Sequence, residues 1–251
     1  DFVKKITLPP SPGDSGSAIG AAYYSYLKHN TKKNIYLPKP SLFPSKYNFR
    51  AQKKLAEKII NSKFKIITSS PTEIINITAE LISKGKVVGT ILENSETGPR
   101  ALGNRSIICD GKNKDAVQFL NTIIKKRSPF RPTAPCMQEK AAKKYYVIRN
   151  ELMECYKTMS ATCKCKENSE AETFPTTHVD KTARIQIVEE GQFLNELLNE
   201  LKNYSIDILA NSSLNLSGDP TSFDLIDTLM ISSRSPLEYI VSDFGVLKVI
   251  Q

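Results

Sequence analysis

The sequence has no long apolar run, only two histidines and an odd number of cysteines. No uninterrupted apolar stretch approaches the roughly 20 residues that a helix needs to span a bilayer, so we expect no membrane segment. The residues from Asp1 to Lys5 are not a signal peptide, and the missing initiator methionine indicates a fragment. The five cysteines are irregularly spaced, which argues against a secreted disulfide framework and predicts a cytoplasmic protein.

The charge is unevenly balanced, with 35 lysines and arginines against 26 acidic residues and a formal net charge of +9. Such a basic surface suits nucleic acid, an anionic membrane or a phosphorylated small molecule. A non-catalytic nucleic-acid-binding module would need basic stripes with interleaved aromatic residues, and the sequence has no such stripe. The tightest basic cluster, at residues 125–127, favours a phosphate-rich small ligand instead, and we expect no nucleic-acid partner.

The apolar pattern alternates between strands and helices from about residue 49 onward. We predict an α/β domain over residues 49–251, with a twisted mixed sheet and flanking helices. Residues 140–172 are rich in lysine, cysteine and glutamate and predict a variable surface excursion, whereas the proline-rich residues 31–48 predict a linker. The predicted strands lie near residues 64–68, 87–92, 106–109, 185–188, 206–209, 239 and 246, and the predicted helices cover residues 50–62, 70–84, 115–124, 193–201 and 223–232.

Residues 96–106, between two predicted strands, read Glu-Thr-Gly-Pro-Arg-Ala-Leu-Gly-Asn-Arg-Ser. Glycine lets the backbone approach a ligand closely, and arginine offers a planar fork for phosphate or carboxylate. A surface hairpin with two solvated arginines would show the same local pattern, so the composition of this segment leaves both interpretations open.

The wording of this segment resembles a signature of the nodulation-type O-carbamoyltransferases, in the domain of that family that is similar to threonylcarbamoyl-adenylate synthases. Residues 121–135, 177–188 and 211–220 resemble three further motifs of the same domain, in the same order. Two departures are Ser128, where the family usually has glutamate, and Lys181, where it has glycine. Lysine tolerates a left-handed backbone less well than glycine, so the turn at Lys181 is in doubt.

The resemblance implies that ATP and carbamoyl phosphate, with Mg²⁺ accompanying ATP, are converted to carbamoyl-adenylate in this domain. Its carbamoyl group would then pass to a hydroxyl acceptor, a sugar or natural product that the sequence does not identify. Glu96 is expected to hold Arg100 or Arg105. The implied catalytic residues are Arg100, Lys125, Arg131 and Arg184, and the implied ligand-binding residues are Gly98, Arg105, Arg127, His178, Asp180, Asn211, Ser213 and Asn215.

Residues 13–22 resemble the last glycine-rich motif of the family's other domain, an actin/sugar-kinase-like transferase domain. The resemblance implies that Asp14 binds a divalent metal such as iron, together with two histidines of an H-x-x-x-H motif. The sequence contains no such motif, since its histidines are His29 and His178. Asp14 could instead simply cap a helix. We expect residues 1–48 to be the tail of that domain plus a linker, with the N-terminal transferase domain as a partner.

One rival enzyme is a tRNA-modifying threonylcarbamoyl-adenylate synthase, which would share the predicted fold. The G-P-R-A-L-G-N-R-S wording at residues 98–106 and the H-V-D wording at 178–180 point away from it. The O-carbamoyltransferase would use carbamoyl phosphate as its carbonyl source, whereas the tRNA-modifying synthase would use threonine plus bicarbonate.

Overall fold

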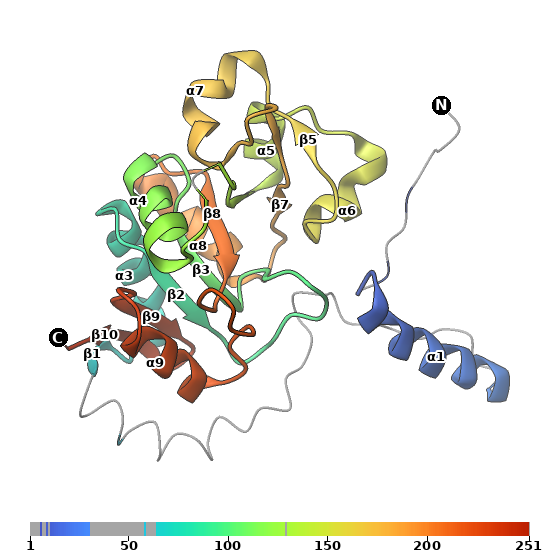
Figure 1. The fold of residues 1–251 in the computed structure, drawn as a ribbon, viewed down its shortest axis with the longest axis horizontal. Coiled ribbons are helices and arrows are strands. Elements are labelled where there is room, and N and C mark those ends of the chain that lie inside the picture. Colours follow the sequence, from blue (N-terminus) through green and yellow to red (C-terminus); the bar gives the residue numbers. More distant parts are fainter. Residues whose placement is uncertain are drawn as a thin grey trace.

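The computed structural model describes residues 11–30, 64–128 and 130–250, together with positions 6, 9 and 58. An eight-stranded mixed sheet in the order β1-β10-β9-β2-β3-β8-β4-β7 forms its centre (Figure 1), which confirms the predicted α/β class. The pairs β2–β9 and β4–β7 are parallel. The strands are β1 (Phe64–Thr68), β2 (Val88–Ile91), β3 (Arg105–Asp110), β4 (Ala134–Met137), β7 (Gln186–Ile187), β8 (Leu209–Ser213), β9 (Tyr239–Ser242) and β10 (Gly245–Val249).

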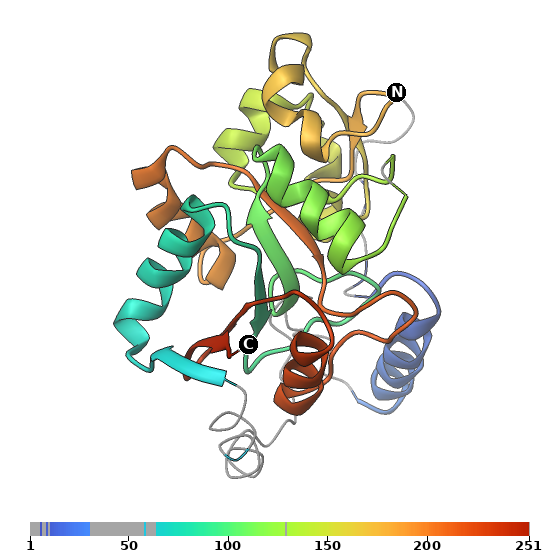
Figure 2. The ribbon, with the colours of Figure 1, turned by 60° about the vertical axis from the view of Figure 1, so that its left-hand side comes forward.

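The central strands are apolar on both faces because helices cover both faces of the sheet. Neighbouring residues of β3 enter different core clusters, Ile107 on one face and Ile108 on the other, as the two-residue period of a strand requires. Figure 2 shows helices on either side of the central strands. The first cluster receives α4 (Lys114–Gln118), the π-helix η2 (Phe119–Ile124) and α9 (Leu225–Ser233), and the second receives α3 (Pro71–Ser83) and α8 (Phe193–Leu201).

The segment predicted as a surface excursion is more ordered than its composition suggests. A third cluster buries the side chains of Tyr145, Tyr146 and Tyr156 fully. It also contains Ile185 and Ile208, which directly precede strands β7 and β8 of the sheet. The segment therefore has a small core of its own that is anchored to the sheet. The elements over residues 139–183 are α5 (Glu139–Tyr145), η3 (Asn150–Leu152), α6 (Met153–Lys157), β5 (Cys163–Lys164), η4 (Glu167–Ser169), α7 (Glu170–Thr173), η5 (Phe174–Thr176) and β6 (Thr182–Ala183). A further short helix, η6 (Lys202–Tyr204), follows α8.

An ion-pair network joins this segment to the sheet. The Nζ of Lys112, just after β3, lies 2.7 Å from Asp207 Oδ1 and 2.9 Å from Glu172 Oε2, and it donates to Tyr145 Oη at 2.7 Å. Burial opposes the charge on Lys112, but the hydrogen bonds to Asp207, Tyr145 and Glu172 outweigh it and raise the pKa of the ammonium. The network fixes α7 relative to the end of β3, and α7 leads directly into η5.

The five cysteines are all free and buried. Burial raises the pKa of the Cys163 thiol to about 12, with the neighbouring Cys165 adding to the effect. A thiol held in its neutral form is a poor nucleophile and a poor metal ligand. The cysteines of this segment are therefore packing residues.

The N-terminal helix α1 (Asp14–His29) has no buried side chain among its described residues, and Figure 1 shows it apart from the sheet. Its N-cap is Gly13, so Asp14 lies inside the first turn and does not cap the helix. The predicted linker at 31–48 and nearly all of the predicted helix at 50–62 lie outside the described residues. No helix in the described ranges has both the length and the apolar character to cross a bilayer.

Replacing Leu197 by alanine tests the α8 side of the core. Leu197 is fully buried among α3 and the sheet, so its truncation leaves a cavity that should lower the free energy of unfolding by about 2–5 kcal/mol in urea denaturation. The exposed Glu196 of the same helix is the control, and Glu196→Ala should change that free energy by only about 0.5 kcal/mol. Equal effects of the two substitutions would contradict the packing described.

Candidate functional site

The carboxylate of Glu96 holds the loop that precedes β3. Its Oε1 accepts hydrogen bonds from the backbone N–H groups of Leu102 at 2.7 Å, Asn104 at 2.6 Å and Arg105 at 3.1 Å. The loop turns through Gly98 and Gly103, whose φ angles of 101° and 124° favour glycine. Glu96 therefore holds Arg105, one of the two arginines expected from the sequence, through the backbone N–H of that residue.

Arg105 also belongs to the framework of this loop. Its side chain is buried at 2 % exposure, and the guanidinium donates to the carbonyl oxygens of Leu92 at 2.5 Å, Asn94 at 3.0 Å and Phe223 at 3.3 Å. A guanidinium engaged with backbone carbonyls ties these loops together. Arg105 therefore has a structural role, and its expected ligand contact stays a prediction.

Asn211 has a similar bracing position at the centre of β8. It is buried, and its Nδ2 donates to Gln186 Oε1 at 2.8 Å and to the carbonyl oxygen of Ala101 at 3.2 Å. Gln186 in turn donates to the carbonyl oxygen of Leu102 at 2.8 Å. The two amides fasten the 101–102 backbone to the sheet, so Asn211 positions this loop, and its expected ligand contact stays a prediction.

The π-helix η2 delivers Lys125 into the interior of the site. The N–H of Lys125 donates to the carbonyl oxygen of Leu120 at 3.0 Å, five residues back, and Lys126 adopts a left-handed φ of 48°. The Lys125 Nζ donates to the carbonyl oxygens of Ser213 at 2.8 Å and Asn215 at 2.7 Å, and to Asn215 Oδ1 at 2.5 Å. Lys125, Ser213 and Asn215, expected together from the sequence, are brought together by the fold.

Four arginines lie near Lys125 or near one another. Burial, and then the charges of Arg127 and Arg131, lower the pKa of Lys125 to about 7. Burial followed by Arg131 and Arg184 lowers the pKa of Arg127, and burial followed by Arg100 and Arg131 lowers that of Arg184. These mutual effects place the five cations at one site, although they come from positions 100 to 184 of the chain. We call Arg100, Lys125, Arg127, Arg131 and Arg184 the cation cluster.

Acidic side chains do not neutralise this cluster. Within the described ranges, none of its five members forms an ion pair with an aspartate or a glutamate, while lysines elsewhere, such as Lys112 and Lys157, do. Like charges gathered without a counter-charge repel one another. The arrangement can bind a group that carries several negative charges, with planar guanidinium forks suited to phosphate oxygens.

The turn at residues 178–182 lies beside the cluster. Asp180 Oδ1 accepts from Thr182 Oγ1 at 2.7 Å and from its backbone N–H at 2.9 Å, and it lies 2.9 Å from His178 Nδ1. The Thr182 hydroxyl, followed by His178, lowers the pKa of Asp180 to about 2. Lys181 has a φ of 64°, the conformation that glycine would adopt most easily. The turn doubted from the sequence is formed, with lysine in a left-handed backbone.

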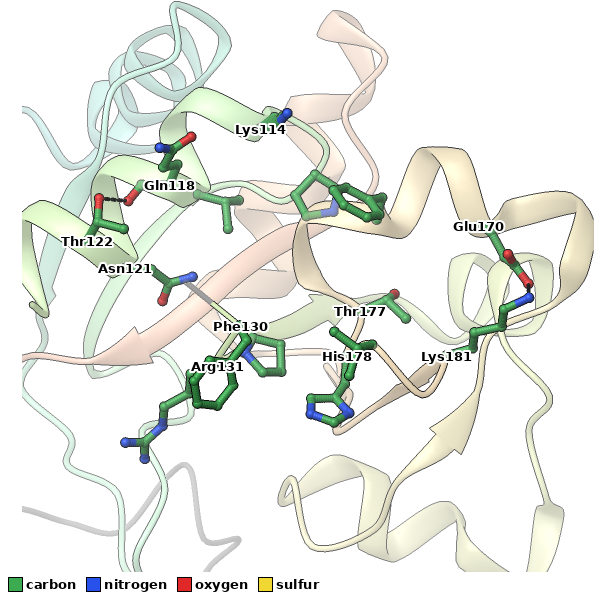
Figure 3. Close-up of a pocket in the computed structure, with 15 residues that line it drawn as sticks. Lys114, Gln118, Asn121, Thr122, Phe130, Arg131, Glu170, Thr177, His178 and Lys181 are labelled. Atoms are coloured by element: carbon green, nitrogen blue, oxygen red, sulfur yellow. Dashed lines mark hydrogen bonds and ion pairs between the residues drawn. The ribbon is translucent and has the colours of Figure 1, made fainter. Parts of the chain in front are cut away.

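A hollow of about 440 Å³ lies between α4–η2 and residues 174–181 (Figure 3). Its lining includes nine residues of the motif segments 121–135 and 177–188, among them Asn121, Arg131 and His178. Phe174 lines it too, and the sequence did not single it out because it lies between the predicted surface excursion at 140–172 and the motif that begins at Thr177. The sequence feature that could have indicated Phe174 was a lone aromatic residue shortly before the H-V-D motif at residues 178–180.

The expected metal residue, Asp14, lies in the exposed first turn of α1. Among the residues that the structure describes, no group of three or more histidine, cysteine, aspartate or glutamate side chains could hold a metal ion. A protein metal site typically uses about three protein ligands, so the described residues do not fit a metal at Asp14. The metal role of Asp14 stays a prediction.

Comparison with known sequences shows which proteins this domain resembles. A family profile described as "Carbamoyltransferase C-terminus" matches residues 79–248. The nodulation protein NolNO of Sinorhizobium fredii is 29% identical over 94% of this chain and 35% of its own length. A 3'-hydroxymethylcephem-O-carbamoyltransferase of Streptomyces clavuligerus is 32% identical over 55% of this chain and 26% of its own length. The chain thus spans only a minor part of these relatives.

Solved structures agree on the fold. Full-length HypF, in a phosphate- and nucleotide-bound form, superposes with a TM-score of 0.50 at 17% identity over 74% of this chain and 22% of that chain. Sua5 from P. abyssi gives a TM-score of 0.50 at 14% identity, over 70% of this chain and 50% of that chain. At these identities the likeness concerns the fold, and it confirms the predicted similarity to the threonylcarbamoyl-adenylate synthase fold.

Two substitutions at Lys181 test the strained turn. Both Lys181→Gly and Lys181→Ala remove the ion pair with Glu170, so comparing them isolates the backbone effect. A left-handed backbone costs free energy for alanine but not for glycine. The free energy of unfolding should therefore be about 1 kcal/mol higher for the glycine variant than for the alanine variant. Equal or reversed stabilities in urea denaturation would show that the turn is not left-handed.

The pKa of Lys125 predicts a pH-dependent anion affinity. An anion favours the charged ammonium, which is fully present below pH 7 and is lost as the pH rises through about 7. Sulfate, whose own charge is constant over this range, should therefore bind more weakly as the pH rises from about 6 to about 9. Calorimetric titration measures this.

The matched control for this titration is Lys125→Arg, which keeps its charge throughout that range. Its sulfate affinity should be flat with pH. A flat profile in the unsubstituted protein would contradict a lowered pKa at Lys125.

Proposed function

This chain belongs to the carbamoyltransferase family, matching its C-terminal domain, and on that premise we propose that residues 64–250 bind ATP and carbamoyl phosphate and form carbamoyl-adenylate. The observation that carries the proposal is the cation cluster without an acidic partner in the described ranges. ATP and carbamoyl phosphate are both polyanions. Their phosphates supply the counter-charge that the described part of the chain does not.

The proposed formation of carbamoyl-adenylate proceeds in two steps. Water splits carbamoyl phosphate into phosphate and carbamate, and a carbamate oxygen then attacks the α-phosphorus of ATP. The new P–O bond gives carbamoyl-adenylate, and the bond to the β-phosphate breaks to release pyrophosphate. Negative charge develops on the leaving phosphates in both steps, and preorganised cations stabilise such charge strongly. We assign this stabilisation to Arg100, Lys125, Arg131 and Arg184.

The remaining polar groups orient the phosphates. Ser213 Oγ donates to Asn215 Oδ1 at 2.6 Å, and both residues hold the Lys125 ammonium in place. The Gly98 turn allows close approach of the backbone, and Arg127 adds a further fork. Mg²⁺ would neutralise part of the nucleotide charge. The cluster contributes no carboxylate, so we expect phosphate oxygens and water to hold that ion.

Transfer to an acceptor requires a third step, in which an acceptor hydroxyl attacks the carbamoyl carbon and AMP leaves. We assign this step to the N-terminal transferase domain of a longer protein, with residues 1–48 as its tail and linker. The short share of the relatives that this chain spans supports the assignment. So does α1, whose Tyr24 is 70% exposed and has no core to enter. We propose a cytoplasmic biosynthetic enzyme whose acceptor is a sugar or natural product.

The proposal is tested by ATP–pyrophosphate exchange. Exchange should depend on carbamoyl phosphate. If Arg100 acts as a preorganised donor, Arg100→Ala should remove roughly 2–4 kcal/mol of transition-state stabilisation and slow the exchange accordingly. Arg100 is exposed, so its loss should not unfold the chain. The exposed Arg149, outside the cation cluster, is the matched control, and Arg149→Ala should leave the rate unchanged.

Two results of this assay would contradict the proposal. Exchange that depends on threonine plus bicarbonate would support the tRNA-modifying synthase instead. Absence of any exchange, together with tight binding of RNA, would support a nucleic-acid-binding module.

A further inference from the structure

Another pocket lies within residues 139–183, and no step of the proposed reaction uses it. It has a volume of about 320 Å³, and its lining includes Val147, Leu152 of η3, Tyr156 of α6, Lys164 of β5 and Thr182 of β6. We call it the α6 pocket. It shares no lining residue with the hollow beside α4 and η2, and no member of the cation cluster lines it. In Figure 1, α6 and β5 lie at the right of this segment, whereas α4 lies at the left of the domain.

Tyr156 brings an unpaired polar group to the wall of the α6 pocket. The residue is 0% exposed, and its Oη has no hydrogen-bond partner in the part of the chain that the structure describes. Burial raises the pKa of the phenol, and the nearby backbone N–H of Arg149 opposes this only in part. That N–H is itself a donor, so the hydroxyl proton is left without an acceptor. A buried donor of this kind costs free energy, and native proteins keep few of them.

The mouth of the α6 pocket carries a positive charge. Lys164 lines it with an exposed side chain, whose ammonium has neither an ion pair nor a hydrogen bond within the described ranges. By contrast, Lys143 of the same segment is paired with Glu139. Lys164 lies directly opposite Thr182 in the β5–β6 pair, so the two side chains share the face that borders the pocket. An anion at this place would meet an ammonium that has no other partner.

Apolar side chains complete the lining. Val147 is 51% exposed at the rim and Leu152 is partly buried. Pockets for small molecules range from about 300 to 1,000 Å³, so the α6 pocket takes a small occupant. That occupant needs an oxygen that accepts from Tyr156, a negative charge for Lys164 and an apolar part. An inorganic oxyanion lacks the apolar part, whereas a short carboxylate has all three.

We propose that the α6 pocket is a binding site for a small aliphatic carboxylate. One carboxylate oxygen accepts the hydrogen bond of the Tyr156 hydroxyl, the charge faces the Lys164 ammonium, and the alkyl chain lies against Val147 and Leu152. Because Tyr156 is closed to bulk water, the exposed side chains of Val147 and Lys164 move aside as the ligand enters. The site is independent of the carbamoyl-adenylate chemistry, since it uses none of the cation cluster.

Titration with butyrate, followed by the backbone amide resonances of the protein, tests where this carboxylate binds. The resonances of Val147, Lys164 and Thr182 should shift on addition of butyrate. Butanol has a similar alkyl chain without the charge, so at the same concentration it should shift them much less.

Substitutions then test how the carboxylate is held. Tyr156→Phe removes only the hydroxyl and should weaken butyrate binding about tenfold, as for the loss of a hydrogen bond to a charged group. Lys164→Gln should weaken it only about threefold, because an exposed ion pair contributes little. Lys140→Gln is the matched control, since Lys140 is an exposed lysine of the same segment that does not line the pocket. It should leave butyrate binding unchanged.

A stability measurement without ligand examines the same hydroxyl independently. Tyr156→Phe should raise the urea midpoint of unfolding, because phenylalanine fills nearly the same volume and removes the donor that has no acceptor. A hydroxyl that the folded protein needed for itself would give the opposite sign. A more stable protein that binds butyrate more weakly is the combination expected of a group that serves a ligand.

Several results would overturn the proposal. They are butyrate-dependent shifts confined to the cation cluster, absence of any shift at the pocket, equal butyrate affinity with and without the Tyr156 hydroxyl, and a lowered urea midpoint in Tyr156→Phe. If that variant fails to fold, Lys164→Gln remains decisive because Lys164 is exposed. Butyrate affinity that stays equal in Lys164→Gln and Lys140→Gln would then contradict the site.

Discussion

Mutual repulsion among five cations is the constraint on which the rest of this site depends. Burial and the charges of neighbouring arginines lower the pKa of Lys125, Arg127 and Arg184, and these like charges would separate if their backbone were free to move. The framework resists this. Glu96 gathers three backbone amides of one loop, Arg105 ties that loop to others, and the carbonyl groups of Ser213 and Asn215 hold Lys125. The site is therefore prepared for anions by hydrogen bonds between side chains and backbone groups around it.

The architecture serves this arrangement by bringing distant segments to one region. The cation cluster draws on the β2–β3 loop, the end of η2, the approach to β4 and the segment between β6 and β7. The Lys112 network then fixes α7 and with it the wall formed by residues 174–181. A segment with its own small core thus contributes to the binding surface of the whole domain.

Much of the fold could be predicted because its strands are short apolar runs. The predicted strand at 87–92 contains β2, whereas the predicted strand at 206–209 overlaps β8 only at Leu209. The predicted helix at 115–124 exists, but its second half is the π-helix η2. The site was predictable only as a set of residue types. The letters of a motif do not say whether a side chain faces a ligand or the interior, which is why Arg105 and Asn211 were expected at the ligand and lie buried. Phe174 was missed since its environment is created by tertiary packing.

The most direct test of the account is the structure of this protein with a non-hydrolysable ATP analogue bound. The account predicts electron density for the triphosphate within hydrogen-bond distance of the Arg131, Arg184 and Lys125 side chains. It also predicts that Arg105 keeps its backbone carbonyl partners in the complex. Density for the triphosphate elsewhere on the protein, with the cation cluster unchanged, would contradict the claim that this cluster is the phosphate-binding site.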